Sequence, residues 1–392
     1  VTPSLTRFTV DNLDDTGKTV GRLNALNTIG SIIGTFVPTF VTIPAVGTAR
    51  TFLIFAAILA VISLGFFVSR KKWIARSAVL AAVITALVFM PFSYSFAFWE
   101  DDLAVEDESI YNYLQVKETD ESVVLSTNVA FGVQSIMMKG GGLTGMYYDY
   151  ALAAPMMAED CRDVLILGLG TGTFATQCLK YFPGCSVTGV EIDEKIVALS
   201  REYFGLPEEV EAVVGDGRAY LTDSGMYDVI MVDAYQDITI PFQMSTVEFF
   251  SLVADHLTED GVMVVNMNMH SDGEGSINAH LSDTISSVFE NVYTADVPRT
   301  TNRELFAAVD GDPIQWLQAN RADITDGELS LQMARVEQNL TAYTPGDHIL
   351  TDDQAPVELL GMGAIDGLIQ DQLGYYQEIF REEGLSGLLS RF

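Results

Sequence analysis

Small and acidic side chains follow successive apolar runs between residues 163 and 266, where their types and spacing could do chemistry. The run Val164–Leu167 leads directly into three glycines at alternate positions, Gly168, Gly170 and Gly172. Glycine permits a tight turn, and main-chain N–H groups at the start of a following helix can approach a bound ligand closely. This segment therefore predicts a loop that holds a nucleoside-bearing ligand.

Acidic residues follow three of the later apolar runs. Glu191 ends the run 186–190, and a carboxylate there can accept hydrogen bonds from both ribose hydroxyls of a nucleoside. Asp216 follows the run 210–214 and is placed to reach an adenine amino group, and Asp233 ends the next run. Each of these residues alone is more typical of a solvated carboxylate at a strand end. Together with the glycine loop, and in this order, they favour a single ligand site.

The glycine spacing also bears on which nucleoside binds. A dinucleotide-binding loop has the pattern G-x-G-x-x-G, but Thr173 stands where the third glycine of that pattern would be. The loop therefore favours an adenosyl sulfonium compound over NAD.

Alternating strands and helices must position these residues. Strand-length apolar runs separated by helical segments predict a doubly wound parallel sheet over 161–311, with ligands at the carboxyl ends of its strands. Short β-branched and aromatic runs upstream predict a small antiparallel β unit with a connecting helix over 109–160. These runs lie at 110–118, 123–128 and 132–139. Residues 312–392 are expected to form a helical C-terminal extension.

The region 1–98 has the composition of membrane helices. From Thr28 to Phe98 the formal charges are five basic residues, and three apolar runs approach the ~20 residues that a helix needs to cross a bilayer. The runs cover 28–47, 51–69 and 77–98. We therefore expect three spans in contact with membrane lipid, followed by an acidic linker over 99–108. A very hydrophobic soluble helical domain is the alternative.

Four basic residues give conflicting information about topology. Arg70, Lys71, Lys72 and Arg76 lie between the second and third runs, which the positive-inside rule places in the cytoplasm. If the third run then crosses the membrane, the rest of the chain lies outside. A domain that uses a cytosolic nucleotide compound is instead expected inside. We expect a multi-pass membrane protein with its soluble domain in the cytoplasm, which requires a re-entrant run or further helices upstream of this sequence. An external domain is the alternative.

The overall composition excludes several kinds of partner. The 392 residues include 53 Asp and Glu but 21 Lys and Arg, a formal charge of −32 that would repel nucleic-acid phosphates. Three cysteines without paired spacing imply no disulfide framework. Four histidines show no metal-ligand spacing, so we expect no metal. A homo-oligomer is compatible with the sequence, which does not fix the oligomeric state.

Several segments resemble the spermidine synthase-like family, and in particular its membrane-fused branch with N-terminal transmembrane helices. The similar segments are VGRLNALNTIGSIIGTFVPTFVTIPAVGT, ESIYNYLQV, GVQ, GLTGMYYDYALAAPMM, EID, GDGRAYL, TVEFF and LTDDQAPVE. The resemblance implies a Rossmann sheet like that of S-adenosylmethionine-dependent methyltransferases, after a small β unit and the membrane helices. It also implies a polyamine-biosynthesis enzyme that moves an aminopropyl group from decarboxylated S-adenosylmethionine to a polyamine, releasing methylthioadenosine.

The resemblance also implies roles for individual residues. Asp233 would be the catalytic carboxylate that orients the attacking amine and helps to deprotonate it. The residues that would hold the adenosyl compound are Gln134, Gly168, Gly170, Gly172, Glu191, Asp216 and Gly217. The residues that would contact the substrate are Tyr147, Tyr148, Asp149, Tyr235 and Asp237. The tyrosines could enclose a cation by cation–π contact, or equally be packed aromatic residues.

Three departures from the family pattern weaken the expected polyamine site. Thr171 occupies the loop position where the family usually has an Asp that holds the substrate amino group. The family's Tyr-His-Glu block is Tyr147-Tyr148-Asp149 here, and its Asp-x-x-Asp-Pro loop has an extra residue before Asp237. A site for a di-cation needs several carboxylates, because each desolvated ammonium group must be paired.

The same departures leave two other functions open. Thr171 would not repel the carboxylate of intact S-adenosylmethionine, so a transferase or lyase that acts on the intact compound is one alternative. A nucleoside-sensing domain coupled to the membrane helices, without enzymatic activity, is the other.

Overall fold

The computed structural model divides the chain into two compact units, Val1–Gln115 and Val116–Phe392. The residues that it describes are 16–69, 73–89, 102–128, 133–235, 240–268, 273, 275–364, 377, 379 and 381. The boundary between the units falls within a strand. The first unit therefore extends beyond the predicted membrane region 1–98.

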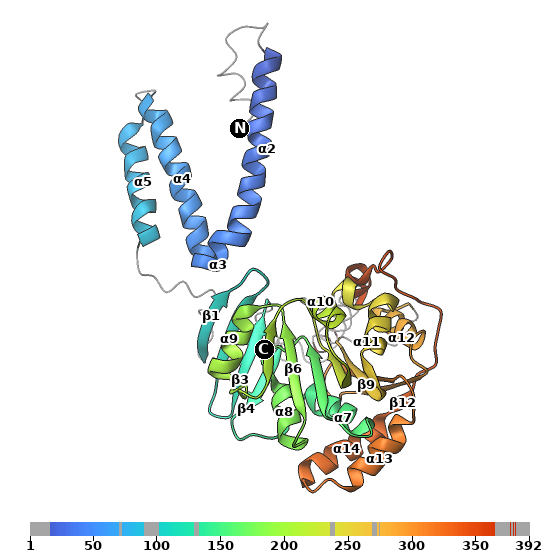
Figure 1. Ribbon diagram of the computed structural model, residues 1–392. Helices are drawn as coiled ribbons and strands as arrows, with labels where there is room; N and C mark the ends of the chain where they lie inside the picture. Colours follow the sequence, from blue (N-terminus) through green and yellow to red (C-terminus); the bar gives the residue numbers. More distant parts are fainter. Residues whose placement is uncertain are drawn as a thin grey trace. The chain divides into compact units, whose positions relative to one another are not determined.

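Apolar helices form most of the first unit. α2 (Thr16–Val37) continues through the π-helical turn η2 (Pro38–Thr42) into α3 (Ile43–Val46). α4 (Thr48–Ser69) and α5 (Ile74–Phe89) follow and lie side by side (Figure 1). The N-terminal helices that the sequence predicts are therefore present.

Two helical stretches in the described residues are long and apolar enough to cross a membrane, Gly17–Val46 and Thr48–Ser69. Length and composition alone do not separate such helices from core helices or signal sequences. Many large apolar side chains of these two stretches are exposed in the structure, as for Ile29 at 54%. The described part of the third predicted span, 77–98, belongs to α5, and the rest of that span lies outside the described residues.

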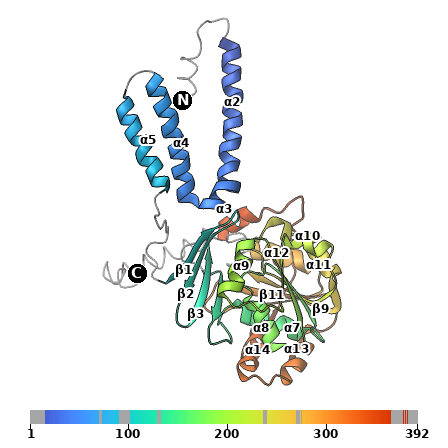
Figure 2. The ribbon, with the colours of Figure 1, turned by 60° about the vertical axis from the view of Figure 1, so that its left-hand side comes forward.

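A four-stranded sheet follows the helices, in the order β1-β2-β3-β4. Its strands are β1 (Leu103–Glu108), β2 (Tyr113–Glu118) and β3 (Ser122–Thr127), which Figure 2 labels, and β4 (Ser135–Met138). Residues 103–108, which we predicted as part of an acidic linker over 99–108, instead form the strand β1. Leu103 and Val105 alternate with exposed residues, and pairing with β2 outweighs the acidic composition that suggested a linker.

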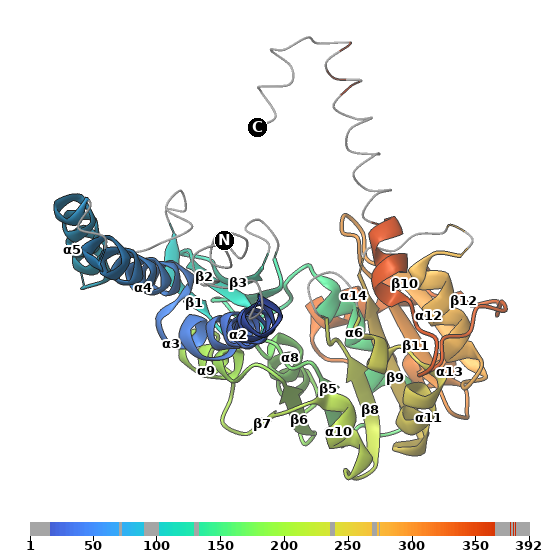
Figure 3. The ribbon, with the colours of Figure 1, turned by 90° about the horizontal axis from the view of Figure 1, so that it is seen from above.

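The second unit is organised around an eight-stranded mixed sheet, in the order β12-β10-β11-β9-β8-β5-β6-β7 (Figure 3). The strands are β5 (Asp163–Leu167), β6 (Ser186–Glu191), β7 (Glu211–Val214), β8 (Tyr227–Val232), β9 (Leu257–Met267), β10 (Asn291–Asp296), β11 (Arg303–Ala308) and β12 (Thr341–Ala342). β5 to β9 are parallel to one another, whereas β10, β11 and β12 join by antiparallel pairing.

Helices cover both faces of this sheet because alternate side chains of each strand point to opposite sides. Val164 and Ile166 of β5 belong to one apolar core, and Leu165 and Leu167 belong to the other. The first core is covered by α6 (Tyr147–Ala151), α7 (Ala153–Met157), α8 (Thr173–Tyr181), α13 (Pro313–Ala322) and α14 (Gly327–Asn339). The second is covered by α10 (Gly217–Thr222), α11 (Val247–Asp255) and α12 (Ile277–Ser286). α9 (Glu194–Tyr203) and the 3-10 turn η3 (Phe242–Met244) also belong to this unit.

The predicted α/β fold is confirmed. The connecting helix expected within 109–160 forms as the short helices α6 and α7. The extension 312–392 is helical in α13, α14 and residues 357–364, but β12 joins the sheet. Strand order reverses at β5, whose neighbours are β6 and β8, so the crevice beside the carboxyl end of β5 is the expected ligand position.

Candidate functional site

The loop after β5 forms one wall of this crevice. The N–H groups of Gly168 and Leu169 donate to the carbonyl oxygen of Val190, at 2.9 and 3.0 Å, and join the loop to the end of β6. Gly168 has a φ of +96°, and a Cβ atom there would lie 2.4 Å from the carbonyl oxygen of Asp233. Glycine is therefore needed at this position for β5 and β8 to end so close together.

Glu191 lies at the end of β6, with 8% of its surface exposed. Its Oε2 accepts a hydrogen bond from Gly170 N at 2.9 Å, and its Oε1 accepts one from Asp193 N at 3.1 Å. Burial raises the pKa of the carboxyl group, while these main-chain hydrogen bonds oppose the rise. A carboxylate has about four lone-pair positions, so both oxygens can still accept bonds from ribose hydroxyls.

Asp216 and Gly217 lie at the next strand end. Asp216 is exposed and caps α10, because its Oδ1 accepts a hydrogen bond from Ala219 N at 2.8 Å. The preceding Gly215 donates its N–H to the carbonyl oxygen of Glu191 at 3.0 Å. The ends of β6 and β7 therefore bring Glu191 and Asp216 to the same edge of the sheet.

Asp233 follows β8 and is held by two side chains from distant parts of the chain. Its Oδ2 accepts a hydrogen bond from the Tyr147 hydroxyl at 2.6 Å, and its Oδ1 accepts one from Asn266 Nδ2 at 2.8 Å. The residue as a whole is partly exposed. Loss of contact with bulk water raises the pKa of Asp233 to about 7, the two hydrogen bonds lower it, and the charge of Glu191 raises it further. Asp233 is thus oriented and can change protonation state near neutral pH.

Two buried tyrosines of α6 lie against Asp233. The ring centroids of Tyr147 and Tyr148 are 4.0 Å apart with an angle of 41° between the planes. Burial and the charge of Asp233 raise the pKa of both hydroxyls, so they remain protonated and act as donors. The Tyr148 hydroxyl donates to the carbonyl oxygen of Gln134 at 2.9 Å, which joins the segment before β4 to the site.

Tyr235 and Thr171 have their hydroxyls engaged by neighbouring groups. The Tyr235 hydroxyl donates to the carbonyl oxygen of Asn266 and accepts from Asn268 N at 3.0 Å, so the side chain folds onto the end of β9. The buried Thr171 hydroxyl lies 3.3 Å from that of Thr173.

Asp149, which we predicted as a substrate residue, has a carboxylate surrounded by donors of the protein. It accepts hydrogen bonds from the N–H and hydroxyl of Thr144, from Gly145 N and from Gln177 Nε2, at 2.6–3.1 Å. These bonds shape the loop that leads into α6, and thereby position Tyr147. Asp237 lies outside the residues that the structure describes.

Sequence analysis did not identify the polar residues on the antiparallel side of the sheet. Asn266, at the end of β9, donates to Asp233 and accepts from Asn302 Nδ2 at 2.8 Å. Glu304 lies opposite Asn266 on β11 and has no exposed surface. Glu304 directly precedes the apolar run Leu305–Val309, and a carboxylate at the edge of such a run could have drawn attention to it.

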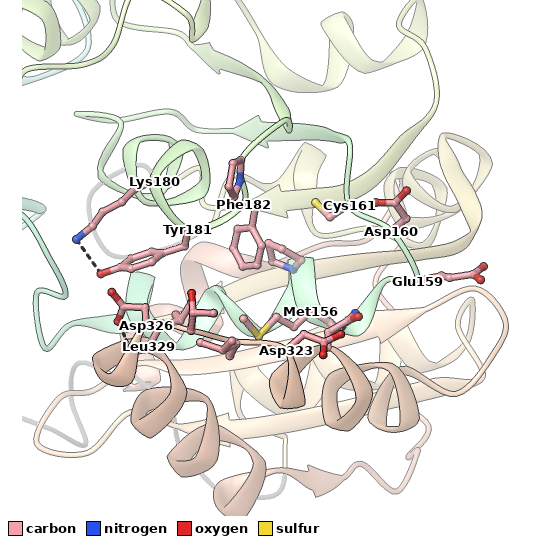
Figure 4. A pocket seen from close by; sticks show the side chains of 15 residues that line it. Met156, Glu159, Asp160, Cys161, Lys180, Tyr181, Phe182, Asp323, Asp326 and Leu329 are labelled. Atoms are coloured by element: carbon pink, nitrogen blue, oxygen red, sulfur yellow. Dashed lines mark hydrogen bonds between the residues drawn. The ribbon is translucent and has the colours of Figure 1, made fainter.

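Elsewhere in the second unit, a cavity of about 590 Å³ lies beside the amino end of β5. Acidic side chains including Asp160 and Asp326 line it, together with Lys180 and Tyr181 from the end of α8 (Figure 4). It shares no residue with the predicted site, which lies at the opposite end of β5. Within the described residues, no group of three or more His, Cys, Asp or Glu side chains could hold a metal ion.

Comparisons with known proteins find relatives of this chain among the polyamine aminopropyltransferases. Residues 146–311 match the family described as the spermine/spermidine synthase domain. The chain is 54% identical over 333 residues to a probable polyamine aminopropyl transferase of Bifidobacterium longum, covering 79% of this chain and 75% of that protein. It is 25% identical over 300 residues to a polyamine aminopropyltransferase of Vibrio vulnificus, covering 72% and 98%. A crystal structure of a probable spermidine synthase from Corynebacterium glutamicum superposes with a TM-score of 0.48 at 20% identity, covering 62% and 97%.

Proposed function

Because the chain belongs to the polyamine aminopropyltransferase family of transferases, we propose that it moves an aminopropyl group from decarboxylated S-adenosylmethionine to a polyamine and releases methylthioadenosine. The observation that carries this proposal is the position of Asp233. Its carboxylate is fixed by Tyr147 and Asn266 beside the glycine loop, where a reacting carbon and an attacking amine could meet.

Two physical effects account for catalysis in this proposal. The amine nitrogen forms a bond to the carbon attached to sulfur, the carbon–sulfur bond breaks, and its electron pair leaves with the sulfur as a neutral thioether. Holding the two reactants in line can contribute roughly 7–11 kcal/mol in well-oriented cases. Asp233, in its ionised form, accepts the hydrogen bond and then the proton of the attacking nitrogen. Its pKa of about 7 suits that role near neutral pH.

The charges of the site favour the decarboxylated co-substrate. Glu191 and Asp233 lie close enough for the charge of one to raise the pKa of the other, and such a site attracts cations. The carboxylate of intact S-adenosylmethionine would be repelled. Glu191 and Asp216 would bind the ribose and the adenine, and the glycine loop would contact the region between adenosine and sulfur.

A second candidate function rests on Thr171. A buried threonine stands where the family usually has a carboxylate, and its hydroxyl faces Thr173. A site with one carboxylate fewer repels the intact co-substrate less. A transferase or lyase acting on intact S-adenosylmethionine is therefore the reaction against which the first proposal must be tested.

The proposal includes a membrane tether formed by Gly17–Val46 and Thr48–Ser69. The exposed apolar surface of these helices needs a nonaqueous environment. We place the transferase domain in the cytoplasm, where an adenosyl co-substrate is available, although the basic residues between α4 and α5 favour the opposite orientation. Protease added to intact cells that express the chain should leave a cytoplasmic domain uncut, whereas cleavage before lysis would contradict this placement.

The enzymatic proposal is tested with the purified full chain, decarboxylated S-adenosylmethionine and 1,4-diaminobutane. We expect the aminopropylated amine and methylthioadenosine in equal amounts by mass spectrometry. Asp233→Asn should lower kcat by about 10²–10⁴-fold, whereas Asp255→Asn, the same change at an exposed residue of α11, should have no effect. Products from intact S-adenosylmethionine alone would contradict the proposal. Methylthioadenosine formed without an amine would favour a lyase, and tight binding without turnover would favour a sensor.

A further inference from the structure

Glu304 is a buried carboxylate without a partner in the protein. It has 0% exposed surface, and neither Oε1 nor Oε2 has a hydrogen-bond partner among the residues that the structure describes. The adjacent Arg303 binds Asp296 instead. An unpaired buried carboxylate is costly unless it is protonated or meets a cation. Such a residue near the start of a strand therefore requires an explanation.

The strand register places Glu304 in the same row as the proposed catalytic residue. Glu304 is paired with Asn266 across β11 and β9, and directly opposite residues of an antiparallel pair point to the same face. Asn266 in turn donates to Asp233, which follows the neighbouring strand β8. Glu304 therefore lies two strands from Asp233, a backbone separation of about 10 Å at ~4.8 Å per strand.

The two carboxylates and Tyr235 influence one another electrostatically. Burial, and then the charge of Asp233, raise the pKa of Glu304 well above its ordinary value. Burial, and after it the charges of Asp233 and Glu304, raise the pKa of Tyr235, so this side chain lies near both carboxylates. Asn302, two residues before Glu304 on the same face, is bonded to Asn266. A protonated Glu304 would ionise when a cation bound beside it.

Glu304 and the residues proposed to bind the adenosyl compound lie on opposite sides of Asp233 along the sheet. The adenosyl residues lie at the ends of β5, β6 and β7, Asp233 follows β8, and Glu304 lies beyond β9 on the opposite side. An acceptor amine that attacks beside Asp233 therefore has its remaining carbon chain on the Glu304 side. A diamine carries its second positive charge in that direction.

We propose that Glu304 binds the second ammonium group of the acceptor, so that the enzyme selects diamines and longer polyamines over monoamines. This inference rests on the proposed function and names the substrate class of the same site. Glu304 would supply a carboxylate to a site where Thr171 replaces the usual Asp. Because Glu304 is covered, a neighbouring side chain must turn aside when the amine binds, and Tyr235 is placed to do so.

Selectivity between two acceptors of equal length tests the proposal. We compare kcat/KM for 1,4-diaminobutane and for 1-aminobutane, with decarboxylated S-adenosylmethionine saturating. Glu304→Gln should lower the value for the diamine by about 10–100-fold, since hydrogen bonds to charged groups are among the stronger ones. The value for the monoamine and the KM of the adenosyl compound should stay within twofold. Glu290→Gln, the same change at an exposed residue before β10, is the matched control.

Three results would overturn the proposal: an unchanged diamine preference in Glu304→Gln, an equal loss for both amines, or a rise in the KM of the adenosyl compound. Thermal unfolding checks the fold, and Glu304→Met removes the charge in a second way should the glutamine variant fold poorly. If the wild type transfers no aminopropyl group, the proposed function fails. Calorimetric binding of 1,4-diaminobutane to wild type and Glu304→Gln then still decides the role of Glu304, because equal affinities would exclude it.

Discussion

Two buried glutamates in the second unit face opposite halves of the proposed site and differ in their surroundings. Glu191, on the adenosyl side, receives main-chain hydrogen bonds at both oxygens, whereas Glu304, on the acceptor side, receives none from the described residues. Burial raises the pKa of both. A carboxylate satisfied by N–H groups can remain charged beside a neutral ribose. A carboxylate without donors can be charged only beside a cation.

A third buried carboxylate, that of Asp283 in α12, is surrounded by even more hydrogen-bond donors than that of Glu191. It has 2% exposed surface and accepts bonds from the Tyr343 hydroxyl, from Gly346 N, and from N and Nδ1 of His348, at 2.7–3.0 Å. These donors outweigh burial and lower the pKa of Asp283. Asp283 thus ties the segment after β12 to α12, and its saturated bonds leave little capacity for a ligand.

The largest loss of stability is expected from a substitution at Gly168, where the ends of β5 and β8 meet. Gly168→Ala would place a methyl group 2.4 Å from the carbonyl oxygen of Asp233 and would force alanine into a φ of +96°. We expect a loss of about 3 kcal/mol or more in the free energy of unfolding, from steric overlap plus the left-handed conformation. Denaturant unfolding measures it. Gly225→Ala, at a glycine with open space and no positive φ, is the control, and equal stability of the two variants would contradict the expected overlap.

Asp283→Asn should be the next most damaging change, with a loss of about 2–4 kcal/mol, because an amide NH₂ would face donors that need an acceptor. The pKa of Asp283 is lower in the folded chain than its ordinary 3.8. Its contribution is therefore present above that value and is lost as pH falls through the folded pKa. Unfolding at pH 7 and pH 3 should show the difference from wild type narrowing at the lower pH.

The control for that experiment is Asp347→Asn, an exposed position in the same segment. It should leave stability unchanged at both pH values. If Asp283→Asn instead altered the KM of the amine while leaving unfolding unchanged, the distinction between donor-saturated structural carboxylates and open functional ones would be wrong.

The clustering of Gly168, Glu191 and Asp216 at one edge of the sheet could be predicted because the information for it is local. Gly168 and Glu191 directly follow an apolar strand run, and Asp216 comes one residue after another such run. Parallel strands bring their carboxyl ends to one edge. The resemblance added Asp233 as the catalytic group and Tyr147 as a substrate residue. The same local patterns failed for β1, whose acidic residues suggested a linker although strand pairing decides its structure.

The surroundings of Asp233 and Glu304 could not be predicted because their contacts are nonlocal. The hydrogen bond from Tyr147 to Asp233 joins residues 86 positions apart, and that from Asn266 to Asp233 joins residues 33 apart. Asn266 and Glu304 meet only because β11 pairs with β9 rather than with another strand. Nothing in the spacing of single residues fixes such a pairing.

Glu191→Gln should sharpen the comparison between the two glutamates. The glutamine NH₂ would face the N–H of Gly170 or Asp193 and would lose an acceptor for the ribose. We expect the KM of decarboxylated S-adenosylmethionine to rise about 10–100-fold, equivalent to about 1.4–2.7 kcal/mol, with the KM of the amine unchanged. Glu194→Gln, at an exposed residue of α9, is the control. A parallel rise in both KM values would show that the two halves do not act separately.

The smallest effect is expected from Tyr147→Phe, as a shift in the pH dependence of the reaction. It depends on which kind of group donates hydrogen bonds to each carboxylate. Main-chain donors hold Glu191 and cannot be removed by substitution, whereas side chains hold Asp233. The Tyr147 hydroxyl lowers the pKa of Asp233, which is about 7. If Asp233 must be ionised to accept a proton, kcat/KM for the amine rises as pH passes through that value. Tyr147→Phe should move the rise to higher pH by about 0.5–1 unit, the equivalent of one hydrogen bond. Tyr150→Phe on the same helix should leave the rise in place, and an unchanged or lower midpoint in Tyr147→Phe would mean that Tyr147 does not stabilise the ionised form of Asp233.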